Sequence, residues 1–184
     1  MSFGNNSFCA VDLGSHKVTV AIGEQAENNG IKILGVSQKR SKGIKQGSVI
    51  NLEMAMETLN TAIDEAKSIA GVDVKEITLG ISAPSIASFN SYGLAAVESG
   101  EGTMEDLAMA IKTAKSVPMS ADTETLHVLQ RDYVVDGQTG VTEPIGMFAV
   151  RLESNVHIVV VSSRLLQNVR KCVASCVEVI LLIS

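Results

Sequence analysis

The first third of the chain brings three short apolar runs close together, ahead of a long amphipathic segment and a fourth apolar run. The three runs are residues 8–13, 18–22 and 31–36, and the turns between them carry Gly14 and Gly30. Because short glycine-containing turns join strands that run in opposite directions, these runs predict a three-stranded antiparallel meander.

Apolar residues then recur at helical spacing and stop at Gly71, which predicts a five-turn amphipathic helix. Residues 77–81 follow as another strand. The order strand-strand-strand-helix-strand is typical of an α/β layer with a mixed sheet. The predicted inner face of the helix consists of Leu52, Ala55, Leu59, Ala62, Ile63, Ala66 and Ile69.

The chain changes character at Pro84, because the residue before a proline disfavours helix and the pattern after it differs. Residues 85–97 predict a weak strand or a pair of strands, and residues 125–135 and 147–152 predict one strand each. Thr103, with Asp106 three residues later, predicts a capping box at the start of a helix. This middle stretch therefore predicts a small α+β insert. The apolar face of its helix is expected to be Met104, Leu107, Ala108, Ile111 and Ala114.

The last part of the chain returns to a strand-helix-strand pattern. Residues 156–161 predict a buried strand, Ser162 or Ser163 a helix cap, and residues 177–183 a final strand. The insert is therefore predicted to interrupt one larger sheet. The inner face of this second long helix is expected to be Leu165, Leu166, Val169, Cys172, Val173 and Cys176.

Composition excludes several classes of protein. A net charge of −5 argues against a general nucleic-acid binder, and the basic run at residues 39–45 is interpreted as a solvated loop. The longest apolar runs are far shorter than the roughly 20 residues that span a bilayer. The first seven residues have no secretory pattern, so the three cysteines are expected to be reduced and cytoplasmic.

The most informative motif lies where the first predicted strand turns into the second. Asp12 ends the strand, Gly14 and Ser15 form a tight turn, and Lys17 opens the next strand. Glycine lets backbone N–H groups approach phosphate oxygens, and the hydroxyl and the lysine add a donor and a positive charge. Asp12 is suited to hold Mg²⁺ through water. A plain β-turn remains the alternative interpretation, because the long glycine loop of a P-loop is absent.

Several segments, taken in order along almost the whole chain, resemble the FtsA family of bacterial cell-division proteins. The ordered set is more specific than any one of its members. These segments are residues 10–23, 41–47, 79–82, 90–93, 127–129, 136–138, 144–147, 151–153 and 156–159, with Tyr133, Asn168 and residues 171–173.

The resemblance implies an actin-like (ribonuclease H-like) fold with a mixed sheet, interrupted by an inserted α+β subdomain called 1C. Residues 1–83 are expected to form the first part of subdomain 1A, residues 84–161 subdomain 1C, and residues 162–184 the continuation of 1A. The family continues about as long again, so the chain is expected to be an N-terminal fragment or a short form. Residues 176–179 depart from the family pattern and leave the register of the last strand open.

The resemblance also implies ATP and Mg²⁺ between two lobes. Asp12 would position the metal, and Gly14, Ser15 and Lys17 would contact the β- and γ-phosphates. One wall of that cleft is expected to bind ATP weakly or not at all, with little or no hydrolysis.

In the family, FtsA links FtsZ to the membrane at the division site, forms filaments and recruits later division proteins such as FtsN. The resemblance therefore implies a cytoplasmic location at the inner face of the cell membrane, with attachment through a C-terminal helix expected to be absent from this chain. The alternatives are a PilM-like pilus-assembly adaptor and one half of a sugar-kinase-like phosphotransferase.

Other candidate residues favour structural roles. Cys172 and Cys176 lie four apart on one helix, but no further ligands have a matching spacing for a metal. His127 and His157 are expected to be hydrogen-bonded groups of the insert. His16 lies beside the phosphate-loop candidate and is expected to be exposed rather than catalytic.

Overall fold

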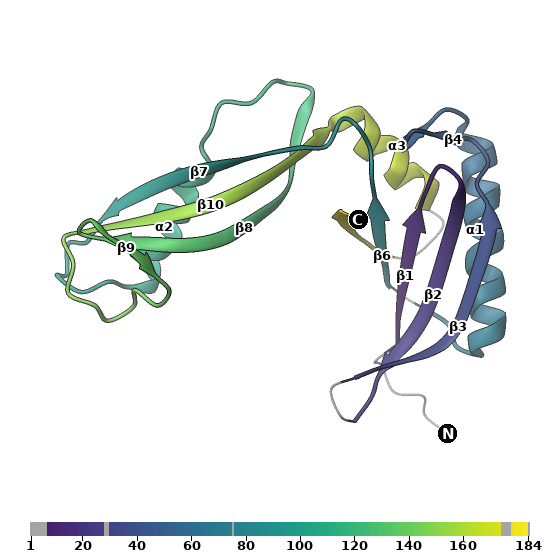
Figure 1. Cartoon of the computed structure of the whole chain (residues 1–184), viewed down its shortest axis with the longest axis horizontal. Coiled ribbons are helices and arrows are strands. Elements are labelled where there is room, and N and C mark those ends of the chain that lie inside the picture. The colour runs from purple at the N-terminus through teal and green to yellow at the C-terminus, as the bar shows by residue number, and fades with distance from the viewer. Residues whose placement is uncertain (1–6, 28–29, 75, 174–177, 184) are drawn as a thin grey trace. The chain divides into compact units, whose positions relative to one another are not determined.

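A computed structural model of the chain describes residues 7–27, 30–74, 76–173 and 178–183. The chain divides into two compact units, which are coloured along the sequence in Figure 1. The first unit comprises Met1–Ser85 and Ser163–Ser184, and the second comprises Ile86–Ser162. The second unit is therefore an insertion within the sequence of the first.

The first unit is built on a five-stranded mixed sheet in the order β11-β6-β1-β2-β3. The first three strands pair antiparallel, as the meander predicted, whereas β6 runs parallel to β1 and β11 parallel to β6. The predicted α/β class with a mixed sheet is thereby confirmed. The strands are β1 (Ser7–Leu13), β2 (Lys17–Gln25), β3 (Ile31–Arg40), β6 (Glu76–Ile81) and β11 (Glu178–Ile183).

Helix α1 (Leu52–Ala70) covers one face of this sheet. Asn51 caps its start by accepting a hydrogen bond from the Met54 N–H at 3.0 Å. Gly71 ends it in a left-handed conformation with φ of 67°. The predicted inner face is confirmed at its centre, but Ile69 is 57% exposed because it lies in the last turn, beyond the buried stripe.

The polar connection between β3 and α1 contains a small hairpin that the sequence pattern did not predict. Two short strands, β4 (Ile44–Lys45) and β5 (Ser48–Val49), pair antiparallel. They are joined by Gln46 and Gly47, both at positive φ, as tight hairpin turns require. Only Ile44 is fully buried among the residues of these strands, so hydrophobic periodicity gave no signal.

The second unit is a four-stranded antiparallel sheet in the order β7-β10-β8-β9, with helix α2 packed on β7 and β10. The second unit contains a helix and an antiparallel sheet, which confirms the predicted α+β insert. The elements are β7 (Ala87–Ala96), α2 (Met104–Lys115), β8 (Thr123–Val135), β9 (Gln138–Val141) and β10 (Arg151–Ser162).

Two details of the predicted insert were wrong. Residues 147–152 and 156–161 were expected to form separate strands, yet β10 begins at Arg151 and continues to Ser162. It therefore joins the end of the first predicted strand to the second and leaves residues 147–150 outside it. The polar residues between them stay in the strand because their hydrogen bonds are satisfied, as when the buried Ser154 hydroxyl donates to Gln130 Oε1 at 3.0 Å. Strand β9 was not predicted, since its exposed residues carry no apolar alternation.

Helix α2 begins with the predicted capping box between Thr103 and Asp106. Its expected apolar face is only partly correct. Met104 is 64% exposed and Ala108 is exposed, whereas Ala110 and Ala114 are fully buried. The helix is therefore rotated so that small side chains meet the sheet.

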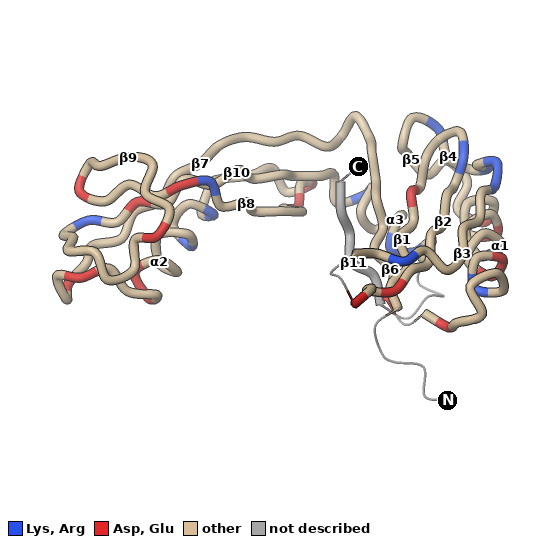
Figure 2. The backbone as a smooth tube through the Cα atoms, turned by 60° about the horizontal axis from the view of Figure 1, so that its bottom comes forward, with Lys and Arg blue, Asp and Glu red and all other residues tan. Residues whose placement is uncertain are grey.

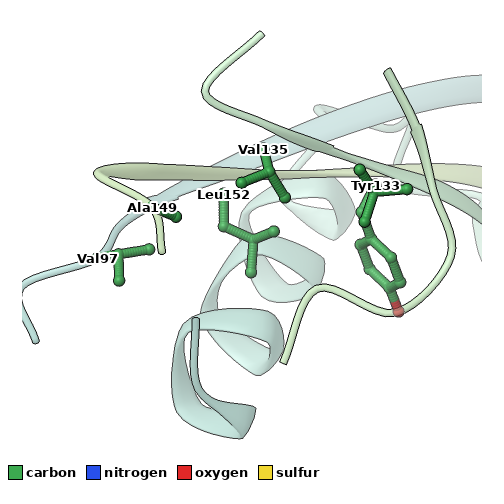
Figure 3. Packing of buried hydrophobic residues seen from close by; sticks show 6 residues of the cluster. Val97, Tyr133, Val135, Ala149 and Leu152 are labelled. Atoms are coloured by element: carbon green, nitrogen blue, oxygen red, sulfur yellow. The ribbon is translucent and has the colours of Figure 1, made fainter. Parts of the chain in front are cut away.

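One end of the second unit has its own hydrophobic core. Figure 3 shows the side chains of this core gathered along the strands beside the helix, with the Tyr133 ring at one side. Leu107 and Met147, which are partly buried, pack against the cluster. The cluster consists of Val97, Tyr133, Val135, Val141, Ala149 and Leu152.

Helix α3 (Ser163–Val173) returns the chain to the first unit, where it packs against α1 and β5. Five of the six residues predicted to share its inner face are buried, and Cys176 lies outside the described residues. In the part of the chain that the structure describes, no helix is long and apolar enough to cross a membrane.

Candidate phosphate-binding site

The four residues predicted to bind phosphate lie on one hairpin. Strands β1 and β2 pair as far as Leu13 and Val18, which leaves residues 14–17 to form the turn. Leu13 is buried on the covered face of the sheet, and Asp12, one residue earlier, is exposed because side chains alternate between the faces. Ser15 and Lys17 are exposed in the turn.

Glycine is required at position 14 because the backbone of Lys17 lies very close to the Gly14 Cα atom. A Cβ atom added there would lie 2.8 Å from the carbonyl oxygen of Lys17, a contact that side-chain atoms essentially never make. Only a residue without a side chain allows the turn to close in this form.

The turn lies at the edge where parallel strands end. Asp12 is in register with Gly80 of β6, and Gly80 is in register with Leu182 of β11. The carboxyl ends of three parallel strands therefore meet at this edge. In open α/β sheets, ligands bind in the crevice outside the carboxyl ends of the strands. The position is therefore suited to binding a small ligand.

The β4–β5 hairpin adds a second element to this edge. The backbone N–H of Gly47 donates a hydrogen bond to Ser15 Oγ at 2.7 Å, and the N–H of Ser41 donates to the His16 carbonyl at 3.0 Å. A Cβ added to Gly47 would lie 1.9 Å from the carbonyl oxygen of Ser82, so the hairpin also touches the end of β6.

The sequence did not indicate that Gly47 contacts the turn or that Ser82 lies against Gly47. The one available signal was the Gln46-Gly47 pair, whose left-handed conformation is typical of a hairpin. Nothing in the sequence spacing places that hairpin against Ser15, because the contact spans 32 residues.

This edge is rich in positive charge. Lys17 is in register with Arg40 across β2 and β3, and Lys42 and Lys45 follow in the connection. All four side chains are exposed, and none forms an ion pair within the described ranges. Figure 2 shows Lys and Arg segments gathered around β4 and β5. The site is therefore suited to an anion.

The donor set fits a magnesium–phosphate group. Asp12 offers an exposed carboxylate, and Ser15 and Lys17 offer a hydroxyl and an ammonium group on the same turn. A hard cation that keeps most of its water needs only one or two carboxylates, so Asp12 suffices for a water-mediated contact.

The other candidate residues have structural surroundings. Cys172 is fully buried, and this burial raises the pKa of its thiol. No group of metal-ligating side chains occurs among residues that the structure describes. His157 Nδ1 is hydrogen-bonded to Asn90 Oδ1 at 2.8 Å, as predicted. The buried Nε2 of His127, contrary to expectation, has no hydrogen-bond partner among the residues that the structure describes. His16 is exposed.

The fold of the first unit defines the structural class of the protein. The strand order of the first unit, with a unit inserted after β6, belongs to the actin-like fold. A solved structure, the PilM-PilN type IV pilus biogenesis complex, matches 94% of this chain and 45% of its own with a TM-score of 0.59. The sequence identity is 8%, so this likeness shows the fold alone.

The sequence comparisons then give the relatives. The family model described as "SHS2 domain inserted in FTSA" matches residues 84–160. The chain is 37% identical over 166 residues to the cell division protein FtsA of Pseudomonas aeruginosa, and equally so to that of Neisseria meningitidis. It is 30% identical to FtsA of Escherichia coli K12.

These matches cover 90% of this chain and 40% of each relative, so the chain spans less than half the length of the proteins it matches. Both the inserted domain and the sequence around it are similar to FtsA. The resemblance to FtsA predicted from the sequence motifs is therefore confirmed.

Proposed function

We propose that this chain is the part of an actin-like cell-division scaffold that carries one phosphate-binding wall and an interaction module. The observation that supports this most strongly is the FtsA likeness along 90% of the chain, which includes the inserted domain at residues 84–160. In this proposal the first unit corresponds to subdomain 1A and the second to subdomain 1C.

The proposed ligand of the first unit is ATP with Mg²⁺. Asp12 holds the metal through water, and Gly14, Ser15 and Lys17 contact the β- and γ-phosphates. The exposed donors on one turn, at the carboxyl ends of β1 and β6, support this assignment. The bound metal ion supplies neutralisation of the phosphate charge, and the turn supplies orientation.

The 184-residue chain contributes one wall of such a site, so its affinity for Mg-ATP is expected to be weak. A site that surrounds only part of its ligand recovers little of the entropy lost on binding. Hydrolysis by the chain alone is expected to be negligible, because phosphoryl transfer depends on positioning from several sides. Isothermal titration checks this, and a micromolar dissociation constant would contradict it.

The proposed partners are division proteins. As part of such a scaffold, the chain acts at the inner face of the cell membrane at the division site, where the whole protein links FtsZ filaments to the membrane. The second unit contributes to filament contacts and to recruitment of later division proteins such as FtsN. The proposed contact elements are helix α2 and residues 130–136, which comprise the end of β8 and the first residue after it.

A pilus-assembly adaptor is the second candidate, because the PilM-containing complex shares the fold over 94% of the chain. Affinity capture from cells expressing the tagged chain separates the two. Recovery of full-length FtsA or FtsN supports the division scaffold, and recovery of PilN instead supports the adaptor. A second capture with residues 86–162 replaced by a Gly-Ser linker tests whether the second unit carries the contact.

A further inference from the structure

The connection between β3 and α1 is fixed against the phosphate turn rather than hanging free. Gly47 N–H donates to Ser15 Oγ at 2.7 Å, and Ser41 N–H donates to the His16 carbonyl at 3.0 Å. The connection crosses the turn and is bonded to it at two successive residues. Its backbone is therefore positioned by the same turn that holds Lys17.

The connection is also folded within itself. The N–H groups of Ile50 and Asn51 both donate to the Gly43 carbonyl, at 2.8 and 3.1 Å. Ile44 is 7% exposed and anchors the β4–β5 hairpin to the unit. Groups presented by a folded connection lose less conformational entropy on binding than groups on a flexible loop.

The lysines on this connection form no ion pair with an acidic side chain in the described residues. Some other lysines of the first unit do form ion pairs, such as Lys39 with Glu65 at 2.9 Å and Lys67 with Asp73 at 2.7 Å. Lys42 and Lys45 are exposed and form no such pair in the ranges that the structure covers. Lys17 and Arg40 are in register and likewise form no ion pair within the described ranges. Four exposed like charges therefore lie on the turn, on the end of β3 and on the connection bonded to the turn, and such a cluster raises the local concentration of anions.

The hydroxyl of Ser15 is oriented by this arrangement. Its oxygen already accepts the hydrogen bond from Gly47, so its hydrogen is left to donate. An anion at the turn would accept a hydrogen bond from that hydroxyl, beside a connection that carries two exposed lysines.

We propose that the connection at residues 41–49 is a second phosphate-contacting element, and that Lys42 and Lys45 bind the same polyphosphate group as the turn at residues 14–17. This inference rests on the proposed nucleotide function and adds binding residues to it. Gly47 acts as a positioning residue, because it holds the hairpin on Ser15.

The test uses the 184-residue chain and inorganic tripolyphosphate with Mg²⁺, followed by backbone NMR shifts at low and high salt. Replacing both lysines (Lys42→Gln with Lys45→Gln) is expected to weaken binding about five-fold or more and to flatten its salt dependence, since two exposed charges are removed. The matched control is Lys112→Gln with Lys115→Gln, two exposed lysines of α2. It is expected to leave binding within about two-fold of the original chain.

Lys17→Gln separates this inference from the function on which it rests. If Lys17→Gln weakens binding and the Lys42/Lys45 variant does not, the inference is overturned and the proposed phosphate turn stands. If the Lys42/Lys45 variant weakens binding and Lys17→Gln does not, anions bind away from the turn and both proposals fail. An absence of shifts at Ser15 and Gly47 in the original chain at millimolar tripolyphosphate overturns the inference as well.

Discussion

Gly93 of β7 packs directly against the backbone of Ala114 in α2. A Cβ added to Gly93 would lie 2.1 Å from the Ala114 nitrogen and 2.2 Å from the Ala110 carbonyl oxygen. The helix therefore approaches the sheet as closely as backbone atoms permit. This contact fixes the distance between the two layers of the second unit.

Gly93→Ala is expected to destabilise the second unit by about 3 kcal/mol, because neither backbone can give way without repacking the layer. Urea unfolding followed by tyrosine fluorescence checks this, since both tyrosines, Tyr92 and Tyr133, lie in the second unit. Ser88→Ala, at an exposed position of the same strand, is the control and should leave the midpoint unchanged. An equal midpoint for Gly93→Ala would show that the layers can separate.

The capping box of α2 provides a second stability prediction. Thr103 Oγ1 accepts from the Asp106 N–H at 3.2 Å, and the Thr103 N–H donates to Asp106 Oδ2 at 3.0 Å. Thr103→Ala is expected to cost about 1 kcal/mol of unfolding free energy, because a helix donor loses its partner. Thr103→Ser keeps the hydroxyl and should recover most of that loss in the same urea experiment. Equal losses in the two variants would mean that the methyl group matters instead.

Glu65 makes the stability of the first unit depend on pH. Its carboxylate accepts hydrogen bonds from Ser37 and then Lys39, which lower its pKa below the ordinary value of 4.5. The unfolded chain binds the proton more tightly than the folded chain does. The stabilisation is therefore complete above pH 4.5 and is lost as the pH falls through the lower folded pKa.

Glu65→Gln is accordingly expected to flatten the fall in stability below pH 4.5, measured by urea unfolding at a series of pH values. Glu57→Gln removes an equal charge from an exposed position of the same helix and serves as the control. A larger flattening in the Glu57 variant would place the titrating group elsewhere.

The buried cysteines are expected to resist labelling. Cys9 and Cys172 are 1% and 0% exposed, and burial raises the pKa of the Cys172 thiol, so little reactive thiolate forms. Labelling with iodoacetamide at pH 8, quantified peptide by peptide, should be at least about ten-fold slower at these sites than at an exposed Ser48→Cys control. Addition of urea should abolish the difference. Rapid labelling of Cys172 in the folded chain would indicate local opening of α3.

Local chemistry was predictable where one signal dominated. The boundaries of α1 followed from its helical period and from Gly71, whose left-handed conformation closes the helix. The capping box at Thr103 followed from a spacing of three residues. The face of α2 was less predictable, since the close approach at Gly93 selects alanines, and small side chains carry little hydrophobic signal.

The candidate site was predictable only in its first half. The turn at residues 14–17 is local, so its residue types and order indicate it directly. The contact between Gly47 and Ser15 joins residues 32 apart, and no periodicity encodes such a pairing. The Gln46-Gly47 turn shows that a hairpin forms, but only the folded sheet shows what that hairpin touches.

The outer strand of the second unit affects how the protein can be handled. β7 lies at one margin of its sheet, runs for 10 residues without a register shift against β10, and contains no charged residue and no proline. Sheet proteins commonly protect such margins with lysine, proline or a bulge. Concentrated solutions of this chain are therefore prone to aggregation by intermolecular pairing of β7. A single lysine introduced along β7 offers the simplest way to keep the chain monomeric.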